Sequence, residues 1–225
     1  MKVILKDCSG YLSIIDAIRL CHSSSDKKDS SPVKSAWGKN DLKLVRSVID
    51  KGHESTLEHS CIIFEVQGMS RACLQEFVRH RIGIGYSVES TRYTLKKLLK
   101  NKKTNLTEMV HQTGNEKVDA LVEKTMKELV NILQKDPTIA NDVLKYALPE
   151  AYLCNLMVTY NFRSLRSFVR LRCTQSALPE IRKVSTLMFY NMRRTALAPL
   201  FADLDTLVGY DQDTLDEYLR SEQIV

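Results

Sequence analysis

A chain of 225 residues, 44% of them hydrophobic, can form one large domain or two small ones around a substantial core. No apolar run reaches membrane-spanning length and the N-terminus lacks the apolar segment of a signal peptide, so we expect a cytoplasmic protein without a membrane partner. Residues 201–225 carry seven acidic side chains and one basic one, whereas residues 1–200 carry a net charge of +12. This basic body favours an anionic ligand, although a solvated basic surface without any ligand is the commoner reason for such a charge.

The first part of the chain alternates short apolar runs with polar connections. Residues 3–5 predict a short strand, and the apolar spacing in 10–21 predicts a helix. The polar stretch 23–39 is typical of a loop. Asp41 is a suitable N-cap for a second helix, and Gly52 stands where a glycine commonly ends one.

A strand and a capped helix precede the most cationic part of the sequence. The largely apolar run 61–66 predicts a buried strand, and Ser70 is a suitable cap for a helix over 71–80. On that helix Glu76 and Arg79 are three residues apart and therefore share a face. The helix ends where the cationic stretch begins, so its side chains and the following loop can contact one ligand.

The second half reads mainly as helix. We expect 100–114 to be an exposed connection and 116–135 to form a helix with one apolar stripe. A short helix from Thr138 should stop at the Leu148-Pro149 pair, because proline cannot continue it. The second half of 151–160 has strand character, and 177–198 predicts a last long helix.

One further helix carries four arginines. Asn161 is a suitable cap for it, and the helix should run to Arg172. Its apolar spacing places Arg172 on the inward side, where a charge needs a partner because an unpaired buried charge is costly. By the same register Arg163, Arg166 and Arg170 lie on other faces, and we expect them to be solvated.

Residues 79–94 read RHRIGIGYSVESTRYT and are the most distinctive part of the chain. Arginine offers a planar fork of donors that fits phosphate or carboxylate. Glycine lets the backbone approach a ligand closely, and hydroxyls with backbone N–H groups complete an anion cradle. The stretch therefore predicts a site for a flat or extended ligand that carries phosphate.

Two other ligand classes compete with this interpretation. His53 and His59 with Glu58 could hold a metal, but their six-residue spacing does not place two ligands on one helix face, so we expect no metal. The basic stretches 92–103 and 163–172 could follow a polynucleotide, but the few aromatic residues do not alternate with the bases as a stacking platform requires. No nucleophile and general base can be paired from their order in the sequence.

Four motifs in the same order resemble the flavin-dependent thymidylate synthases. The Arg-His-Arg triplet, followed by a serine and an Arg-Tyr pair, resembles the central signature of that family. One segment before it and two after it resemble further family motifs, and order and spacing hold from about residue 45 to 185. The matching segments are 52–59, 79–81 with Ser90 and 92–93, 148–149, and 161–165 with 171–172 and 180–182.

The resemblance implies a fold and a reaction. It implies a single α/β domain over residues 1–225, with helices around a central mixed or antiparallel sheet, and a homotetramer with interfacial active sites. The implied reaction is reductive methylation of dUMP to dTMP, with methylenetetrahydrofolate as the carbon donor and NADPH as the reductant of bound FAD. No cysteine of the protein need attack the uracil, and no nucleic-acid polymer is a partner.

The resemblance also assigns the site residues by position. The positions that match flavin contacts are His53, Ser55, Arg79, His80, Arg81, Asn161, Arg163 and Ser167. The positions that match dUMP contacts are Glu76, Arg79, Glu89, Ser90, Thr91, Arg92, Lys145 and Arg172. Ser90, Thr91 and Arg92 would hold the phosphate, and Arg172 would be the catalytic residue that favours the ionised uracil ring. A cation on the inward side of its helix suits the negative charge that develops there.

The chain departs from the family pattern at several contact positions. Eight residues lie between Arg81 and Ser90, one more than is usual in the family. Val88 replaces a common glutamate, Glu76 a common glutamine, and Lys145 a common arginine, which keeps the charge but loses the planar fork. Two alternatives therefore stay open: an inactive relative that binds flavin but does not transfer the methyl group, and a basic nucleic-acid-binding protein.

Overall fold

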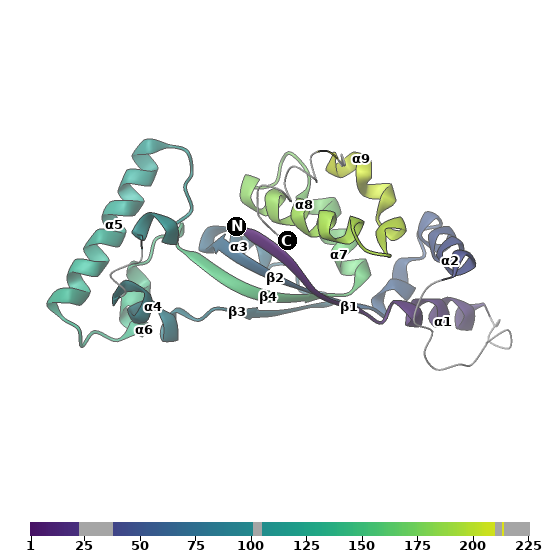
Figure 1. The fold of residues 1–225 in the computed structure, drawn as a ribbon, viewed down its shortest axis with the longest axis horizontal. Helices are drawn as coiled ribbons and strands as arrows, with labels where there is room; N and C mark the ends of the chain where they lie inside the picture. The colour runs from purple at the N-terminus through teal and green to yellow at the C-terminus, as the bar shows by residue number, and fades with distance from the viewer. Residues whose placement is uncertain (23–37, 101–104, 210–212, 214–225) are drawn as a thin grey trace. The chain divides into compact units, whose positions relative to one another are not determined.

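A computed structural model describes residues 1–22, 38–100, 105–209 and 213, and shows a mixed α/β fold (Figure 1). Four strands form an antiparallel sheet in the order β1-β2-β4-β3, which confirms the expected sheet type. The strands are β1 (Lys2–Ser9), β2 (Cys61–Ser70), β3 (Ile84–Val88) and β4 (Leu153–Tyr160). The helices are α1 (Tyr11–Cys21), α2 (Lys39–Asp50), α3 (Arg71–Phe77), α4 (Thr91–Lys100), α5 (Glu116–Lys135), α6 (Asn141–Leu144), α7 (Phe162–Arg172), α8 (Pro179–Arg193) and α9 (Asp205–Val208). Short 3-10 helices are η2 (Glu54–Glu58), η3 (Leu106–Met109), η4 (Lys145–Ala147), η5 (Ala198–Leu200) and η6 (Ala202–Leu204).

The chain folds into two compact units. Among the described residues, the first unit contains Met1, 66–79, 87–100 and 105–156. The second contains 2–22, 38–65, 80–86, 157–209 and 213. Strands β2, β3 and β4 each contribute residues to both units, so the sheet alone does not divide the chain into independent domains. The assignment of residues 1–225 to a single domain stays a prediction.

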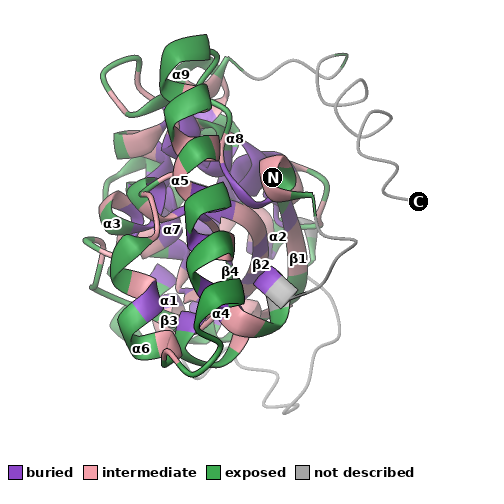
Figure 2. Ribbon diagram, turned by 90° about the vertical axis from the view of Figure 1, so that its left-hand side faces the viewer, coloured by how far each residue is buried: buried purple, intermediate pink, exposed green. Residues whose placement is uncertain are grey.

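The first unit is built around α5, which packs against α4 and η3, while α4 packs against α6 (Figure 1). Asn115 caps α5 by accepting hydrogen bonds from the backbone N–H groups of Lys117 and Val118. The predicted apolar stripe is buried only along its C-terminal part, and Val118 and Leu121 are exposed. Figure 2 shows α5 as a largely exposed helix with a few buried residues. The buried cluster consists of Leu95, Leu99, Met109, Val110, Met126, Leu129, Leu133, Leu144 and Tyr152.

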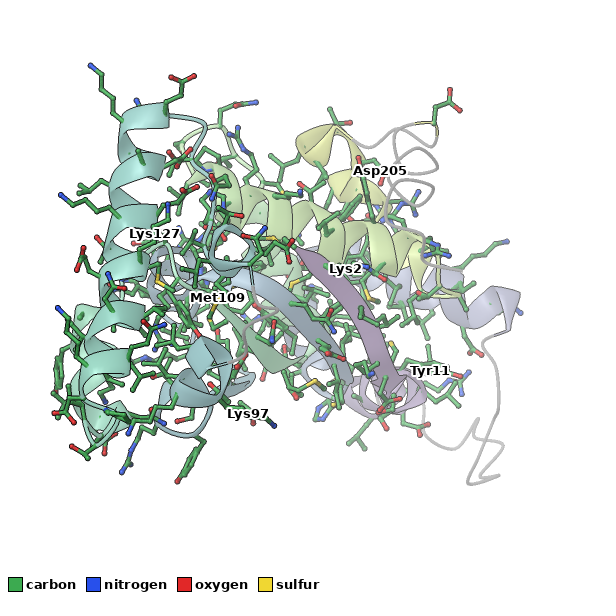
Figure 3. All side chains as sticks on the ribbon, turned by 60° about the vertical axis from the view of Figure 1, so that its left-hand side comes forward. Lys2, Tyr11, Lys97, Met109, Lys127 and Asp205 are labelled. Atoms are coloured by element: carbon green, nitrogen blue, oxygen red, sulfur yellow. The ribbon has the colours of Figure 1, made fainter. Side chains whose placement is uncertain are left out.

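The connection before α5 is more ordered than its polar sequence predicts. Of the expected exposed stretch 100–114, residues 101–104 lie outside the described part, but Met109 and Val110 are buried. Val110 forms an antiparallel bridge with Tyr152, and the His111 N–H donates to the Ala151 carbonyl at 2.7 Å. This backbone pairing accompanies the burial of Met109 and Val110, which the polar composition of the stretch did not predict. Met109 is buried, whereas Lys127 of α5 is exposed; both residues are labelled in Figure 3.

The second unit packs α8 against β1 and places α7 between η2 and α8. The Asn161 side chain accepts from the Ser164 N–H at 2.8 Å, so the predicted cap and both ends of α7 are confirmed. Because α7 contacts elements on two sides, its buried face is wide and includes Phe162, Leu165 and Phe168.

Several predicted boundaries were wrong by a few residues. Asp41 is the third residue of α2 and not its cap; its carboxylate accepts from the Gly38 N–H at 3.1 Å and from Arg19 at 3.0 Å. The helix expected from Thr138 begins at Asn141, after a turn. The last long helix ends at Arg193, and 3-10 turns follow it. The loop predicted for 23–39 lies almost wholly outside the described residues.

None of the helices within the described ranges combines the length and the apolar character that crossing a bilayer requires. All six cysteines lie in the described part, and none of them forms a disulfide.

Candidate functional site

The first unit contains a cleft of about 430 Å³ at the turn between β3 and α4. Its lining includes cationic side chains and the backbone at the start of α4. The cleft is lined by Arg71, Val88, Glu89, Ser90, Thr91, Arg92, Lys145, Tyr146 and Leu148. Five of the eight residues expected to contact the nucleotide therefore lie together here: Glu89, Ser90, Thr91, Arg92 and Lys145.

The β3–α4 turn is fixed by a hydrogen-bond network with Asn155 of β4. The Glu89 N–H donates to the Asn155 carbonyl at 2.8 Å, and the Glu89 carboxylate accepts from the Asn155 amide at 2.9 Å. The Asn155 side-chain oxygen in turn accepts from the Gly68 N–H at 3.0 Å. Glu89 thus holds the turn in place while its neighbours line the cleft.

Helix α4 begins at Thr91, directly after this turn. The Ser90 carbonyl accepts from the N–H groups of Tyr93 at 3.1 Å and Thr94 at 3.2 Å, which starts the helix. The first N–H groups of a ten-residue helix lack intrahelical partners and carry partial positive charge. A phosphate placed there gains both effects.

Two cations beside the turn already have partners. Arg92 donates through Nε to Asp142 at 2.8 Å, and its side chain is 59% exposed. The ammonium of Lys145 lies 5.6 Å from the centre of the Tyr146 ring. Both cations are therefore held near the cleft by weak surface contacts, which an incoming anion can outcompete.

Arg71 is a cleft residue that the sequence analysis did not single out. Its Nη1 atom is buried and has no hydrogen-bond partner among the described residues. Its backbone N–H donates to the Tyr152 carbonyl at 3.0 Å, which fixes it as the first residue of α3. A buried guanidinium nitrogen without a partner is costly, so this atom favours an anionic ligand in the cleft. In the sequence, Arg71 can be recognised only as the residue that follows the helix cap Ser70, and this position does not indicate a ligand contact.

Glu76 and Arg79 form an ion pair, with Arg79 Nη1 and Glu76 Oε1 3.7 Å apart, although Arg79 lies beyond the helix on which the two were expected to share a face. The helix α3 ends at Phe77, so this pair lies at its C-terminal end and not within a longer helix. Neither residue lines the cleft, and Arg79 is 73% exposed.

In the second unit, His80 and Arg172 meet. Arg172 donates from Nε to His80 Nε2 at 2.8 Å, which requires that nitrogen to be unprotonated. The His80 ring packs edge-on against Phe168 with ring centres 5.0 Å apart. Tyr86 donates its hydroxyl to the His80 carbonyl at 2.6 Å. The predicted need of Arg172 for a partner is met by a triplet residue from a distant part of the sequence.

The loop after the triplet is fastened to the start of α7. Asn161 donates its N–H to the Gly83 carbonyl at 3.1 Å, and Ser164 donates its hydroxyl to the Ile82 carbonyl at 2.6 Å. Gly83 has φ of +67°, and a Cβ there would overlap the side chains of Asn161 and Ser164. The glycine is therefore required by close approach as well as by its backbone angle. The expected loop also contains strand β3, which the sequence analysis missed.

The remaining positions expected to contact a flavin lie on the surface of the second unit. His53, Ser55, Arg81 and Ser167 are exposed. Arg163 forms an ion pair with Glu58, so the expected contact residue is held by the end of η2. The contacts between α7 and η2 bring the segments of these residues together.

Arg166 contradicts the expectation that it is solvated. Its side chain is 0% exposed, and it donates to Glu54 at 3.1 Å and to Asp203 at 2.6 and 2.9 Å. Burial alone would raise the pKa of Glu54, but hydrogen bonds and charges from Arg170 and Arg166 outweigh it and lower that pKa. For Asp203 burial is likewise outweighed, mainly by the hydrogen bond and charge of Arg166, and its pKa is lowered. The prediction from helical register was wrong because α7 is covered on two sides, by η2 and by α8.

Among the described residues, no cluster of three or more His, Cys, Asp or Glu side chains could hold a metal ion. The structure instead brings the predicted residues together as two sets. One surrounds the cleft of the first unit, and the other links 80–86, η2 and α7 in the second.

Comparison with known proteins gives one consistent result. Residues 5–197 match the family profile described as "Thymidylate synthase complementing protein". The flavin-dependent thymidylate synthase of Campylobacter jejuni strain RM1221 is 42% identical over 180 residues, which cover 77% of this chain and 83% of that protein. The enzyme of the same name from Wolinella succinogenes is 38% identical over 82% of this chain and 90% of its own. A crystal structure of the flavin-dependent thymidylate synthase ThyX from Helicobacter pylori, complexed with FAD and dUMP, matches with a TM-score of 0.72 at 37% identity, covering 84% of this chain and 92% of that one.

Proposed function

Because the chain belongs to the flavin-dependent thymidylate synthase family, we propose that it makes dTMP from dUMP with methylenetetrahydrofolate as carbon donor and NADPH as reductant of bound FAD. The single observation that carries the proposal is the cationic cleft at the β3–α4 turn. In this cleft the Nη1 atom of Arg71 has no hydrogen-bond partner among the described residues. The fit of this cleft to a nucleotide phosphate does not depend on the comparisons.

The dUMP phosphate would bind at the start of α4. Backbone N–H groups at Ser90 and Thr91 and the helix dipole favour an anion there. Arg92 and Lys145 would exchange their weak surface contacts for the phosphate, and the Nη1 atom of Arg71 would gain a charge-assisted hydrogen bond. Glu89, held by Asn155, keeps the turn in the required conformation. Arg79 and its neighbour Glu76 are proposed to contact the nucleotide from the end of α3.

FAD would be held by the residues that match the flavin contacts of the family. We assign this role to His53, Ser55, Arg79, His80, Arg81, Asn161, Arg163 and Ser167. The hydrogen bonds of Asn161 and Ser164 to the 82–83 backbone hold the triplet loop against α7, so cationic and amide groups from distant segments are available to one cofactor. When bound and reduced, the flavin supplies the hydride that completes the methyl group.

Arg172 would stabilise the negative charge that develops on the uracil ring. The bond from its Nε to His80 restricts the rotation of the guanidinium, so less freedom is lost when substrate binds. Tyr86 and Phe168 restrain His80 in turn through a hydrogen bond and a ring contact. This arrangement links the triplet directly to the proposed catalytic arginine.

Two thiols of the chain, those of Cys8 and Cys173, are poorly suited to nucleophilic attack on uracil. Burial, with help from the nearby Asp7 charge, raises the pKa of Cys8 to about 12, and burial also raises the pKa of Cys173. A thiol must ionise to react, so these two are unreactive near neutral pH. Neither of these two cysteines is therefore a candidate nucleophile. A homotetramer with active sites between subunits is part of the proposal.

The test is an assay with single omissions. Purified protein should bind FAD and form dTMP from dUMP, methylenetetrahydrofolate and NADPH, and leaving out any one component should stop product formation. Arg92→Ala should raise the KM for dUMP, whereas Lys97→Ala, an exposed lysine on the same helix (Figure 3), should not. Absence of both flavin binding and dTMP would refute the proposal.

A second candidate is a flavin-binding relative without the transfer step. The observation that favours it is the additional residue between Arg81 and Ser90, together with Glu76 where a glutamine is common. FAD binding and dUMP binding without dTMP would select this candidate.

A further inference from the structure

The most deeply buried charge of the described residues lies outside the residues assigned to substrate or cofactor. Arg166, in the middle of α7, is enclosed by two carboxylates that come from opposite directions along the chain. Glu54 belongs to η2, and Asp203 belongs to η6 near the C-terminus. Arg166 also donates to the Leu200 carbonyl, so the C-terminal segment supplies two of its acceptors.

Both carboxylates are shared with a second arginine. Arg170 donates to the two Glu54 oxygens at 2.7 and 3.1 Å, and it lies 3.6 Å from Asp203. Arg46 of α2 lies 3.3 Å from Asp203. Arg46 also pairs with Asp50 at 3.0 Å, whereas Arg166 and Arg170 share Glu54 and Asp203, so loss of Asp203 leaves Glu54 as the carboxylate that contacts both of these arginines among the described residues.

The segment that supplies Asp203 lies beyond the family match, which ends at residue 197. Leu200, Phe201 and Leu204 from this segment are buried, and the Phe201 ring lies 5.9 Å from the Arg166 guanidinium carbon. Asp205 fastens the end of the segment by accepting from Arg193 at 3.0 Å. The segment is thus a fixed part of the second unit, and its role is not predicted by the family motifs.

Glu54 connects this network to the proposed flavin site. It stands between His53 and Ser55, both exposed, while its own side chain is directed to Arg166 and Arg170 of α7. The anchored carboxylate fixes the backbone of η2, and so it determines where the two flanking side chains are presented.

We propose that Asp203 is a positioning residue for FAD binding, which acts through Arg166 and Glu54 on the segment 53–55. The proposal rests on the proposed function, because the assignment of His53 and Ser55 to the flavin comes from there. Without Asp203, Arg166 keeps its buried charge and draws Glu54 away from Arg170, which displaces η2 and the two residues beside Glu54.

The test compares Asp203→Asn with Asp205→Asn. Both variants remove one negative charge from the same segment, but Asp205 pairs with Arg193 and not with Arg166. We expect Asp203→Asn to raise the FAD dissociation constant about tenfold or more, and Asp205→Asn to leave it within about twofold of the parent. Affinity for labelled dUMP in equilibrium dialysis should stay at the parent value in both, because the network of Glu54, Arg166 and Asp203 includes none of the residues proposed to contact dUMP. Asp203→Glu should restore FAD binding.

The outcomes separate this inference from the proposed function. If the parent protein binds no FAD, the proposed function fails. If the parent binds FAD and folded Asp203→Asn binds it equally well, or Asp205→Asn weakens it equally, only the positioning role is overturned. Should Asp203→Asn not fold, Arg170→Gln applies the same test at a partly exposed residue that holds Glu54 by both oxygens. Parent-like FAD affinity in that variant would then overturn the inference.

Discussion

Replacement of Arg71 by methionine should affect stability and nucleotide binding in opposite directions. In the protein without ligand, the Arg71 Nη1 atom is buried and has no hydrogen-bond partner among the described residues. An unsatisfied buried donor costs about 1–3 kcal/mol, part of which methionine removes while keeping similar length and good helix propensity. We therefore expect the free energy of unfolding to stay the same or to rise by about 1 kcal/mol.

Binding should change by a larger amount. A hydrogen bond to a charged group contributes about 1.5–3 kcal/mol, which corresponds to roughly a 10- to 150-fold weaker dUMP affinity in the variant. Deoxyuridine, which has no phosphate, should bind the parent and the variant equally. The two quantities are measured by urea denaturation and by calorimetric titration with each ligand.

The reasoning fails if Arg71→Met lowers stability by more than about 1 kcal/mol and leaves dUMP affinity unchanged, because Arg71 would then be a structural residue. Arg92→Ala is a useful comparison, since Arg92 is largely exposed and paired with Asp142. Its removal should weaken dUMP binding while changing stability by less than about 1 kcal/mol.

Four further predictions concern the second unit. The pKa values of Glu54 and Asp203 are lowered in the folded state, so both carboxylates stabilise the fold fully above the ordinary carboxyl range and lose this effect as pH falls. The free energy of unfolding should therefore decline below about pH 5, and it should decline less steeply in Asp203→Asn. Urea denaturation at a series of pH values measures both curves. Gly83→Ala should cost about 1–3 kcal/mol in thermal unfolding, because of its positive φ and the overlap with Asn161; a variant as stable as the parent would contradict this. Tyr86→Phe should lower kcat about tenfold or less with little change in FAD affinity, because it removes the hydroxyl that donates to the His80 carbonyl; a parent-like kcat would exclude a positioning role. Arg172→Ala should reduce turnover or dUMP binding strongly while flavin stays bound, and unchanged kinetics would contradict its assignment.

Local signals predicted much of the helical structure. The Asn161 cap fixed the start of α7, and the apolar spacing over 116–135 gave the bounds of α5, because both signals depend on neighbouring residues alone. The strand β3 was missed because its glycine and serine weaken the strand pattern, and its pairing with β4 is made by the backbone.

Side-chain environments could be predicted less well than elements. Arg172 was expected to be the buried cation of α7, whereas Arg166 is fully buried and Arg172 only partly so. Helical register reports one inward face, but η2 and α8 cover two sides of α7, and Asp203 approaches from a segment that no spacing rule connects to it. Arg71 was missed for a related reason, since only the folded cleft shows that its nitrogen is left without a partner among the described residues.

The most direct measurement is the visible spectrum of the purified protein with bound FAD during a titration with dUMP. The account predicts a bound-flavin spectrum that changes saturably with dUMP, with a midpoint that Arg71→Met shifts about tenfold or more to higher concentration. A protein that takes up no flavin, or a flavin spectrum that does not respond to dUMP at any concentration, would contradict it.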